Sequence, residues 1–291
     1  MEDRDWLILT LLYENGNITK TAQDLYISQP ALTSRIKQIE NEFQVKLLIR
    51  GSKGVTFTPQ GEYLVTYAKE MLLKLRETKE NILNLNNTVK GTLRIGTSRF
   101  LAEHKLPRML NSFKEKQTDV DFKIMSSFAS NIINLVSNHD VHVGFHRGDD
   151  HWLGSEHILY REKLYIFSKN KININDLPNI PRIVHKQESA NRGSIHQWWT
   201  EKYGQPPLIA AEVDHVNACK EMVIHGLGYA LLPSSFVSDD DHLHKYDITL
   251  NNGEPLLRIA RMIYLEESLE LNVVRAFVNF VKSLKFRDKL A

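Results

Sequence analysis

The sequence has little cysteine: a single residue, Cys219, among 291. One thiol excludes an internal disulfide framework and a cysteine-rich zinc site, and it suits a reducing compartment. The first residues (MEDRDWLILTLLYENG) carry acidic side chains where an export signal needs a basic flank, and no apolar run is long enough to span a bilayer. These absences predict a cytoplasmic protein without a membrane partner.

Motifs of the common enzyme classes are also lacking. The sequence contains no G-x-S-x-G, no H-E-x-x-H, no phosphate-binding loop and no Rossmann glycine fingerprint. Twelve histidines raise the question of a metal site, and residues 239–244 (DDDHLH) gather acids and imidazoles. Because the spacing of a structural zinc site is absent there, a solvated loop is the better interpretation. We therefore expect no catalytic residues, no cofactor and no metal.

The net charge is small, +2, and the hydrophobic fraction of 42% is that of an ordinary soluble globular protein. The length allows two or three domains. Such a charge does not by itself point to nucleic acid, so any DNA-binding surface must be local.

Residues 17–53 are typical of a winged helix-turn-helix: a short helix, a tight turn, a longer helix and a basic loop. Asn17 or Thr19 can cap the first helix, over 20–26. Ser28 can cap the second, and Pro30 stands in its first turn. Apolar residues of the second helix recur at spacings of 4, 3 and 4, which marks a buried face: Leu32, Ile36, Ile39 and Phe43.

The opposite face and the loop predict the DNA contacts. Between Thr33 and Lys53 five basic residues stand against two acidic ones, enough positive charge to hold phosphates. Gly51 and Gly54 suit a turn between two short strands, with Lys53 at the tip of the wing. We expect base-edge contacts from Gln29, Pro30, Thr33 and Ser34, and phosphate contacts from Arg35, Lys37, Arg50 and Lys53.

Thr58 and Pro59 open a long helix that should run to about residue 89. Its apolar residues alternate at spacings of 4 and 3, with one polar exception, and form a heptad seam: Leu64, Ala68, Met71, Leu75, Thr78, Ile82, Leu85 and Val89. The seam can pack on its own domain or on a second copy of the helix. Dimerisation is the favoured interpretation, because a helix beyond a small domain has no core of its own.

Beyond Lys90-Gly91, buried strands alternate with helical patterns, which predicts parallel βαβ units. A first set has strands at 93–96, 120–125 and 141–146 and helices at 101–116 and 130–138. A second set has strands at 164–168, 180–186, 207–213 and 228–233 and helices at 194–203 and 217–225. An amphipathic helix over 270–284 should pack back on the first set.

Polar residues at the strand ends predict a ligand site, because ligands of parallel sheets bind beyond the carboxyl ends of the strands. Hydroxyls and amides around arginines suit a small carboxylate, with which guanidinium pairs bidentately. Helix capping is the alternative role for any one of the serines. The candidates are Thr97, Ser98, Arg99, Ser126, Ser127, Ser130, His146, Arg147, Asn191, Ser194, Asn217 and Arg258.

The N-terminal part resembles the LysR-type transcriptional regulators. The resemblance rests on Ala22, Leu25, the run from Ser28 to Thr33 (SQPALT), Ile36, Ile39, Glu40, Leu47, Arg50, Gly54, Thr58 and Gly61. Gln44 stands where the family usually has glycine, and Leu48 replaces a common phenylalanine. The C-terminal part resembles the effector domain of the same family, with a local signal in residues 225–235 (HGLGYALLPSS).

The resemblance implies an architecture of three parts. A mainly α-helical winged helix-turn-helix domain (1–58) precedes a long linker helix (59–90) that pairs antiparallel with a second copy. An α/β effector domain (91–291) follows, with two lobes hinged like a periplasmic solute-binding protein. Lobe I takes about 91–161 and 267–291, and lobe II about 162–266. Implied partners are promoter DNA and a small carboxylate effector, in a homodimer or homotetramer, with RNA polymerase a further candidate.

A looser resemblance links HRGD (146–149), IHQWWTEKYG (195–204) and CKEMVIHGLGYALLPSS (219–235) to the subgroup that senses citrate. It implies a multiply charged carboxylate held by Arg147 and Arg258. Two other functions stay open from the sequence: a cytoplasmic α/β enzyme and a DNA-binding regulator without a ligand.

Overall fold

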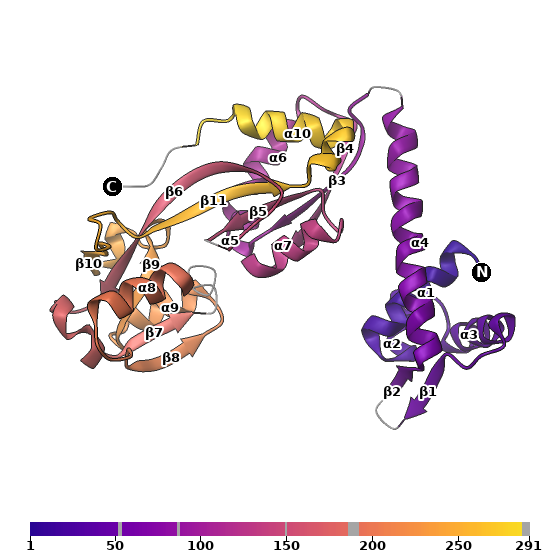
Figure 1. Cartoon of the computed structure of the whole chain (residues 1–291), viewed down its shortest axis with the longest axis horizontal. Coiled ribbons are helices and arrows are strands. Elements are labelled where there is room, and N and C mark those ends of the chain that lie inside the picture. Colours follow the sequence, from indigo (N-terminus) through magenta and orange to yellow (C-terminus); the bar gives the residue numbers. More distant parts are fainter. Residues whose placement is uncertain (52–53, 86–87, 149, 186–191, 287–291) are drawn as a thin grey trace. The chain divides into compact units, whose positions relative to one another are not determined.

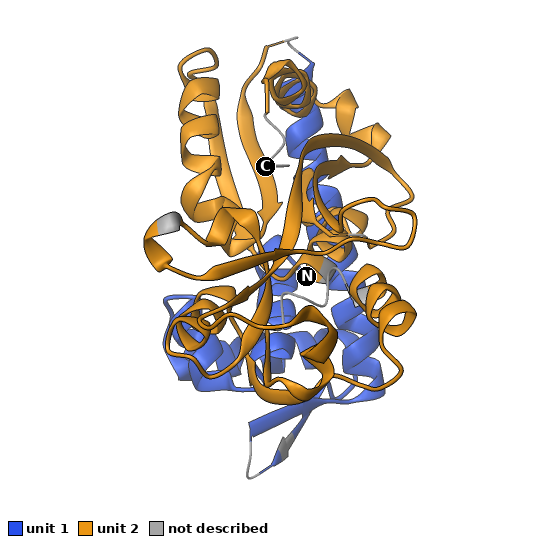
Figure 2. Ribbon diagram, turned by 90° about the vertical axis from the view of Figure 1, so that its left-hand side faces the viewer, with its two compact units in different colours: residues 1–86 blue, residues 87–291 orange. Residues whose placement is uncertain are grey.

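A computed structural model describes residues 1–51, 54–85, 88–148, 150–185 and 192–286. The chain forms two compact units, Met1–Asn86 and Asn87–Ala291 (Figure 2). The long helix that the sequence sets apart as a linker therefore belongs to the first unit. None of the described helices is long and apolar enough to cross a membrane.

The first unit begins with three helices, α1 (Asp3–Asn15), α2 (Ile18–Asp24) and α3 (Gln29–Phe43). The side chain of Asn17 accepts a hydrogen bond of 3.0 Å from the Lys20 amide, and that of Ser28 accepts one of 3.3 Å from the Ala31 amide. Both bonds satisfy amides that a helix start leaves without an intrahelical partner. The predicted caps, and with them the turn between α2 and α3, are confirmed.

Two short antiparallel strands, β1 (Leu48–Gly51) and β2 (Gly54–Phe57), form the predicted wing. Gly54 has φ +128°, and a Cβ there would lie 2.4 Å from the carbonyl oxygen of Gly16. The Val55 amide donates a 2.9 Å hydrogen bond to that same oxygen. Because only glycine allows this approach, Gly54 fixes the wing against the end of α1.

Helix α4 (Pro59–Asn84) begins where predicted, with the Thr58 hydroxyl accepting a 3.0 Å hydrogen bond from the Gly61 amide. It ends at Asn84 rather than near residue 89. The seam divides in two: Leu64 and Ala68 are buried in the core of the first unit, whereas Ile82 is 59% exposed and Leu85, just past the helix, is 80% exposed. Packing on its own domain is therefore correct for the first positions only.

The strands of the second unit join into one nine-stranded sheet, ordered β4-β3-β5-β11-β6-β9-β7-β8, with β10 paired to β6. Their bounds are β3 (Gly91–Thr97), β4 (Val120–Ser126), β5 (Val143–Arg147), β6 (Ser155–Ser168), β7 (Arg182–His185), β8 (Ile209–Val213), β9 (Tyr229–Pro233), β10 (His244–Asp247) and β11 (Leu257–Tyr264). The neighbours β4-β3-β5 and β9-β7-β8 are parallel, as predicted.

Strand β6 connects the two lobes and begins at Ser155, earlier than the predicted 164. Its first part pairs with β11, and residues 164–168 pair with β9 in lobe II. Because β11 also pairs with β5, residues 260–264 belong to lobe I, and the predicted end of lobe II near residue 266 is too late. Figure 1 shows β6 and β11 running side by side between the lobes. Both lobes are therefore parts of one continuous sheet.

Helices cover the faces of this sheet. Lobe I carries α5 (Arg99–His104), α6 (Leu106–Lys114), α7 (Ala129–Ser137) and α10 (Asn272–Ser283), and lobe II carries α8 (Arg192–Lys202) and α9 (Val216–Ile224). The predicted helix over 101–116 is broken at Lys105 into α5 and α6. Short 3-10 turns η1 (Ile174–Asn179), η3 (Ser234–Phe236), η4 (Asp239–Asp241) and η5 (Glu266–Glu270) complete the unit.

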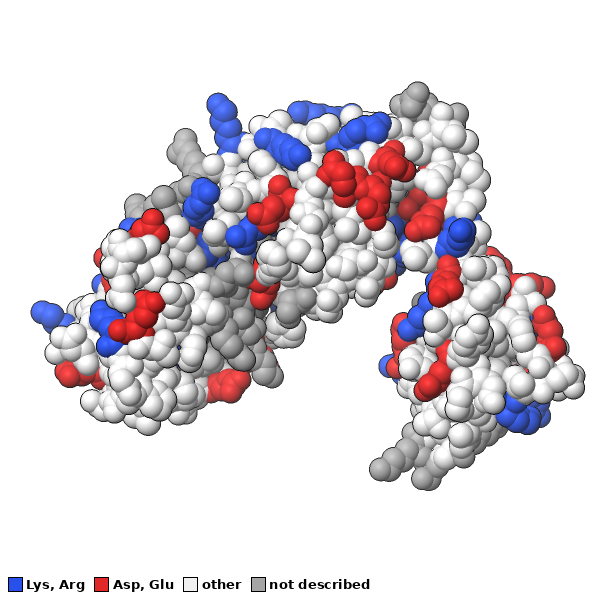
Figure 3. Space-filling model, viewed as in Figure 1, with Lys and Arg blue, Asp and Glu red and all other residues white. Residues whose placement is uncertain are grey.

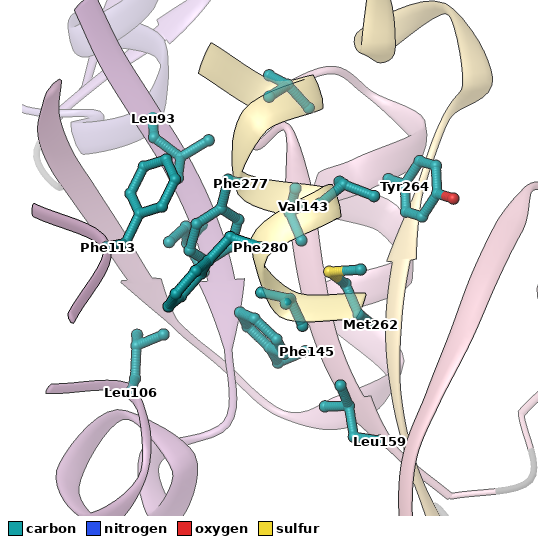
Figure 4. Close-up of a cluster of buried hydrophobic side chains, with 14 of the residues drawn as sticks. Leu93, Leu106, Phe113, Val143, Phe145, Leu159, Met262, Tyr264, Phe277 and Phe280 are labelled. Carbon is teal, nitrogen blue, oxygen red and sulfur yellow. The ribbon is translucent and has the colours of Figure 1, made fainter. Parts of the chain in front are cut away.

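The core of lobe I confirms that the last helix returns to the first set of strands. The Phe113 ring of α6 lies 5.1 Å from Phe277 and 5.3 Å from Phe280, both on α10 (Figure 4). These rings pack over Val143 and Phe145 of β5. The helix over 272–283 is thus part of the core of lobe I.

Candidate DNA-binding and effector sites

The outer face of α3 carries most of the residues predicted to contact bases. Gln29, Pro30 and Ser34 are exposed, as is Lys37, which was predicted to contact a phosphate. Thr33 differs, because its hydroxyl is buried and has no hydrogen-bond partner among the described residues. The polar face is therefore narrower than the sequence predicts, and it lies toward the N-terminal half of the helix.

Arg35 makes its bonds inside the first unit. Its Nε donates to Asp5 Oδ1 at 2.6 Å, its Nη2 to Asp5 Oδ2 at 2.7 Å, and its Nη1 to Gln38 at 2.9 Å. Burial alone would raise the pKa of Asp5, but hydrogen bonds from Arg35 and from the Glu2 amide outweigh it, so the pKa lies below its ordinary value. This pair ties α3 to α1 and argues against the predicted phosphate contact.

Two predicted phosphate contacts remain. Arg50 belongs to β1, and Lys53 lies outside the described residues. The turn between α2 and α3 adds a residue that sequence reasoning missed: Tyr26 has φ 54° and is 96% exposed. On the face drawn in Figure 3, basic and acidic side chains occur on both units, in keeping with a small net charge.

The crossing strands bring four polar residues to one face of the sheet in the second unit. On β11, Ala260 stands opposite both Arg147 of β5 and Tyr160 of β6, and Arg258 stands opposite Glu162 of β6. Because side chains two residues apart along a strand share a face, all four polar residues point the same way. Arg147, Tyr160, Glu162 and Arg258 form what we call the inter-lobe cluster.

The inter-lobe cluster is buried but incompletely paired. Arg147 Nη1 lies 3.7 Å from Glu162 Oε1, beyond hydrogen-bond distance, and each side chain is 1% exposed. The other carboxylate oxygen accepts a 2.7 Å hydrogen bond from the Ser235 hydroxyl. Arg147 Nε and Nη1, Arg258 Nε and Glu162 Oε1 have no hydrogen-bond partner among the described residues.

Burial also changes the acidity of this cluster. It lowers the pKa of Arg258 to about 9, with the positive charge of Arg147 adding to the effect. The Arg258 side chain therefore remains a positively charged guanidinium near neutral pH. The cluster is an electropositive site in a region of low dielectric constant.

Two aromatic rings cover Arg147 and join the lobes. The guanidinium carbon lies 4.6 Å from the centre of the Phe100 ring and 5.7 Å from that of Phe236, and the rings are 4.4 Å apart. Phe100 belongs to α5 in lobe I and Phe236 to η3 in lobe II. Outside them lies a cleft of about 340 Å³, lined by Phe100, His104, Lys105, Asn217, Ser235 and Phe236.

Three predicted residues stand at the end of β3, close to this cleft. Thr97 is buried and its hydroxyl donates to the Ser98 carbonyl at 3.4 Å. The Ser98 hydroxyl is buried without a partner among the described residues, and it makes no capping bond to α5. Arg99 is paired with Glu103 at 2.8 Å and lines an adjoining cleft with His215.

Other predicted residues do not join the inter-lobe cluster. His146 points to the opposite face of β5 from Arg147, because neighbouring residues of a strand alternate, and its Nε2 lies 3.0 Å from Asp150. Ser126 ends the edge strand β4, and the hydroxyl of Ser127, the next residue, accepts a hydrogen bond from Asn131. Ser130 belongs to α7 and Ser194 to α8, and Asn191 lies outside the described residues.

Five residues of the site were missed by sequence reasoning: Phe100, Tyr160, Glu162, Ser235 and Phe236. Glu162 alone carried a usable signal, an acidic residue just before the apolar run predicted as the strand 164–168. Across the residues that the structure describes, no three His, Cys, Asp or Glu side chains come together in a way that could hold a metal ion.

Residues 4–62 match the family described as bacterial regulatory helix-turn-helix protein, lysR family, and residues 86–285 match the LysR substrate binding domain. The chain belongs to the LysR family of transcriptional regulators. This LysR-family protein is 40% identical to YraN of Bacillus subtilis, over 97% of its own chain and 98% of YraN. It is 31% identical to YkuM of the same organism, over 98% of each chain.

Solved structures share the fold along the whole chain. CbnR complexed with its target DNA has a TM-score of 0.67 at 18% identity, covering 97% of this chain and 99% of that one. The Vibrio cholerae virulence activator AphB has a TM-score of 0.66 at 18% identity, covering 98% and 100%. The predicted fold class is confirmed, and the protein is a DNA-binding transcriptional regulator rather than an enzyme.

Proposed function

We propose that a small carboxylate metabolite binds between the two lobes of this LysR-family regulator and changes its action at promoter DNA. The observation that carries this proposal is the inter-lobe cluster, in which Arg147 and Arg258 are buried and some of their guanidinium N–H groups have no partner within the described part of the chain. Buried polar groups without hydrogen bonds cost free energy. A carboxylate entering the cluster would supply the missing acceptors, and guanidinium binds it through two parallel bonds.

The rings of Phe100 and Phe236 stand between the cluster and the cleft. Because they come from different lobes, a small rotation of the lobes would separate them and open a path to Arg147. The cleft of about 340 Å³ outside them is large enough for a small metabolite. A ligand that binds only when the rings are apart would have a higher affinity for the open arrangement of the lobes than for the closed one. This difference in affinity shifts the protein toward the open arrangement, as regulation by a ligand requires.

At the DNA, base edges are contacted by Gln29, Pro30 and Ser34, and phosphates by Lys37, Arg50 and Lys53. The exposed apolar residues around the end of α4 support a homodimer, which suits the reading of two half-sites. A homotetramer, a contact with RNA polymerase and a cytoplasmic location are further parts of the proposal that rest on the family.

The effector proposal is tested by isothermal titration of the full-length protein with carboxylates of different charge, citrate among them. We expect at least one to bind the wild type and to bind Arg147→Met about tenfold or more weakly, since a charge-assisted bond is lost. Arg261→Met is the matched control, because Arg261 lies on β11 but pairs with Glu156 at 3.3 Å. A wild type that binds no carboxylate overturns the proposal and leaves a regulator without this ligand.

The DNA contacts are tested by selecting preferred duplexes from a random library and repeating the selection with Gln29→Ala. Loss of one base contact should remove about 1–3 kcal/mol of discrimination at one base pair. Gln23→Ala, an exposed glutamine of α2, is the control. An unchanged preference for Gln29→Ala would show that the proposed orientation of α3 in the groove is wrong.

A further inference from the structure

The charges of the inter-lobe cluster limit how many negative charges its ligand can carry. We propose that the ligand is a monoanion with a single carboxylate, rather than citrate or another multiply charged acid. This inference rests on the function proposed above and names the chemical class that the same site accepts.

Glu162 is the residue that sets the limit. Its side chain is 1% exposed, it stands opposite Arg258 in the β6–β11 pairing, and it lies 3.7 Å from Arg147. The Ser235 hydroxyl fixes one of its oxygens at 2.7 Å. Two guanidinium charges and one carboxylate charge leave the cluster with one positive charge in excess, which one ligand carboxylate balances.

Among the described residues, the titratable groups nearest the cluster leave this balance unchanged. Burial raises the pKa of Tyr160, which therefore stays neutral, and burial lowers the pKa of His185 to about 3, which keeps its imidazole neutral too. Arg182 lies on the opposite face of β7 from His185 and stacks on Trp199, 5.7 Å from the ring centre. Lys105 lines the cleft outside the two phenylalanine rings and is exposed, where solvent screens its charge.

The second charge of a dicarboxylate would have no partner in this cluster. A buried charge without a counter-charge is far more costly than one that is paired. The rings of Phe100 and Phe236 offer apolar contact instead, which suits an uncharged, hydrophobic remainder of the ligand. We therefore expect a monocarboxylate to bind about tenfold or more tightly than the dicarboxylate of the same carbon skeleton.

The test is isothermal titration of the full-length protein with matched acids that differ by one carboxylate: butyrate and succinate, benzoate and phthalate, with citrate alongside. The expected wild-type result is a preference for the monocarboxylate of each pair. In Glu162→Gln the excess charge rises from one to two, so the preference should shift toward the dicarboxylate by about tenfold. Glu156→Gln, on the same strand but paired with Arg261 at 3.3 Å, should leave the preference unchanged.

Three results would overturn the inference, and they are distinguishable. Wild-type preference for succinate, phthalate or citrate refutes the charge limit while the carboxylate site stands. An unchanged preference in a folded Glu162→Gln shows that Glu162 does not set the limit. Binding of no acid in the panel removes the proposed function and the inference together. If Glu162→Gln does not fold, the wild-type ratios alone decide the charge limit.

Discussion

Arg35 and Lys37 both lie on α3, and the sequence predicts a phosphate contact for each. Replacing Arg35 tests whether it instead stabilises the first unit by binding Asp5. In the structure Arg35 holds Asp5 through two bonds of 2.6 and 2.7 Å. The Asp5 side chain is 1% exposed and that of Arg35 is 35% exposed. Arg35→Met would leave the Asp5 carboxylate buried, with the Glu2 amide as its one remaining hydrogen-bond donor among the described residues.

The size of the effect follows from this partial exposure. Breaking a fully buried ion pair costs about 3–5 kcal/mol. Because Arg35 is partly hydrated, the loss should be closer to that of hydrogen bonds to a charged group, about 1.5–3 kcal/mol. Hydrogen exchange of the α1 and α3 amides in the full-length protein measures it, since local opening reports the stability of that unit.

Lys37→Met is the matched control, since Lys37 is exposed two residues further along the same helix. It should leave hydrogen exchange within about 0.5 kcal/mol of wild type. Its DNA affinity should fall for all sequences, with a salt slope reduced by about 1. Arg35→Met should keep the wild-type slope. The opposite pattern, a stable Arg35→Met with a smaller salt slope, would refute the structural role and restore the phosphate contact.

Three further outcomes are expected. Gly54→Ala should destabilise the wing by on the order of 1–3 kcal/mol in thermal melting and weaken DNA binding in gel shifts, because Gly54 has φ +128° and its Cβ would meet the Gly16 oxygen. Gly51→Ala is the control and should be close to neutral in both assays, since a Cβ there meets nothing nearer than 4.0 Å. Burial alone would raise the pKa of Glu40, but hydrogen bonds from the Leu47 amide and Lys46 outweigh it and lower the pKa below its ordinary 4.5. The ionised Glu40 side chain therefore stabilises the folded protein above that pH, and this stabilisation is lost as the pH falls through the lower pKa of the folded state. Glu40→Gln should therefore melt earlier than wild type at pH ~7 but lose less between pH ~5 and ~3. Ile82→Lys should weaken the proposed homodimer roughly tenfold or more in sedimentation equilibrium, and Lys79→Ala should not.

Local features of the fold could be predicted because short-range rules decide them. The caps at Asn17, Ser28 and Thr58 depend on one hydroxyl or amide facing the first turn of a helix, and each forms as expected. The turn of the wing could be predicted from Gly51 and Gly54, because glycines favour a turn between two short strands. The buried stripe of α3 also held for Leu32, Ile36 and Ile39, whereas Phe43 is 43% exposed.

Long-range pairing could not be predicted. The bond from Arg35 to Asp5 joins residues 30 apart, and basic residues on a recognition helix look alike in sequence whichever way they point. Glu162 meets Arg258 only through the β6–β11 register, which no local pattern specifies. Arg147 was found because a charged residue at a strand end is unusual. The rings that cover it come from separate lobes and carry no local signal.

The return of α10 to the core of lobe I has a consequence for how the protein folds during its synthesis. Lobe I contains strands from the first part of the unit, but its core closes only when Phe277 of α10 reaches Phe113. During synthesis from the N-terminus, lobe I therefore waits for almost the last residues of the chain, after lobe II has emerged. We expect the second unit to fold late and as a whole, and truncations before α10 to expose the apolar side chains around Phe113 to aggregation.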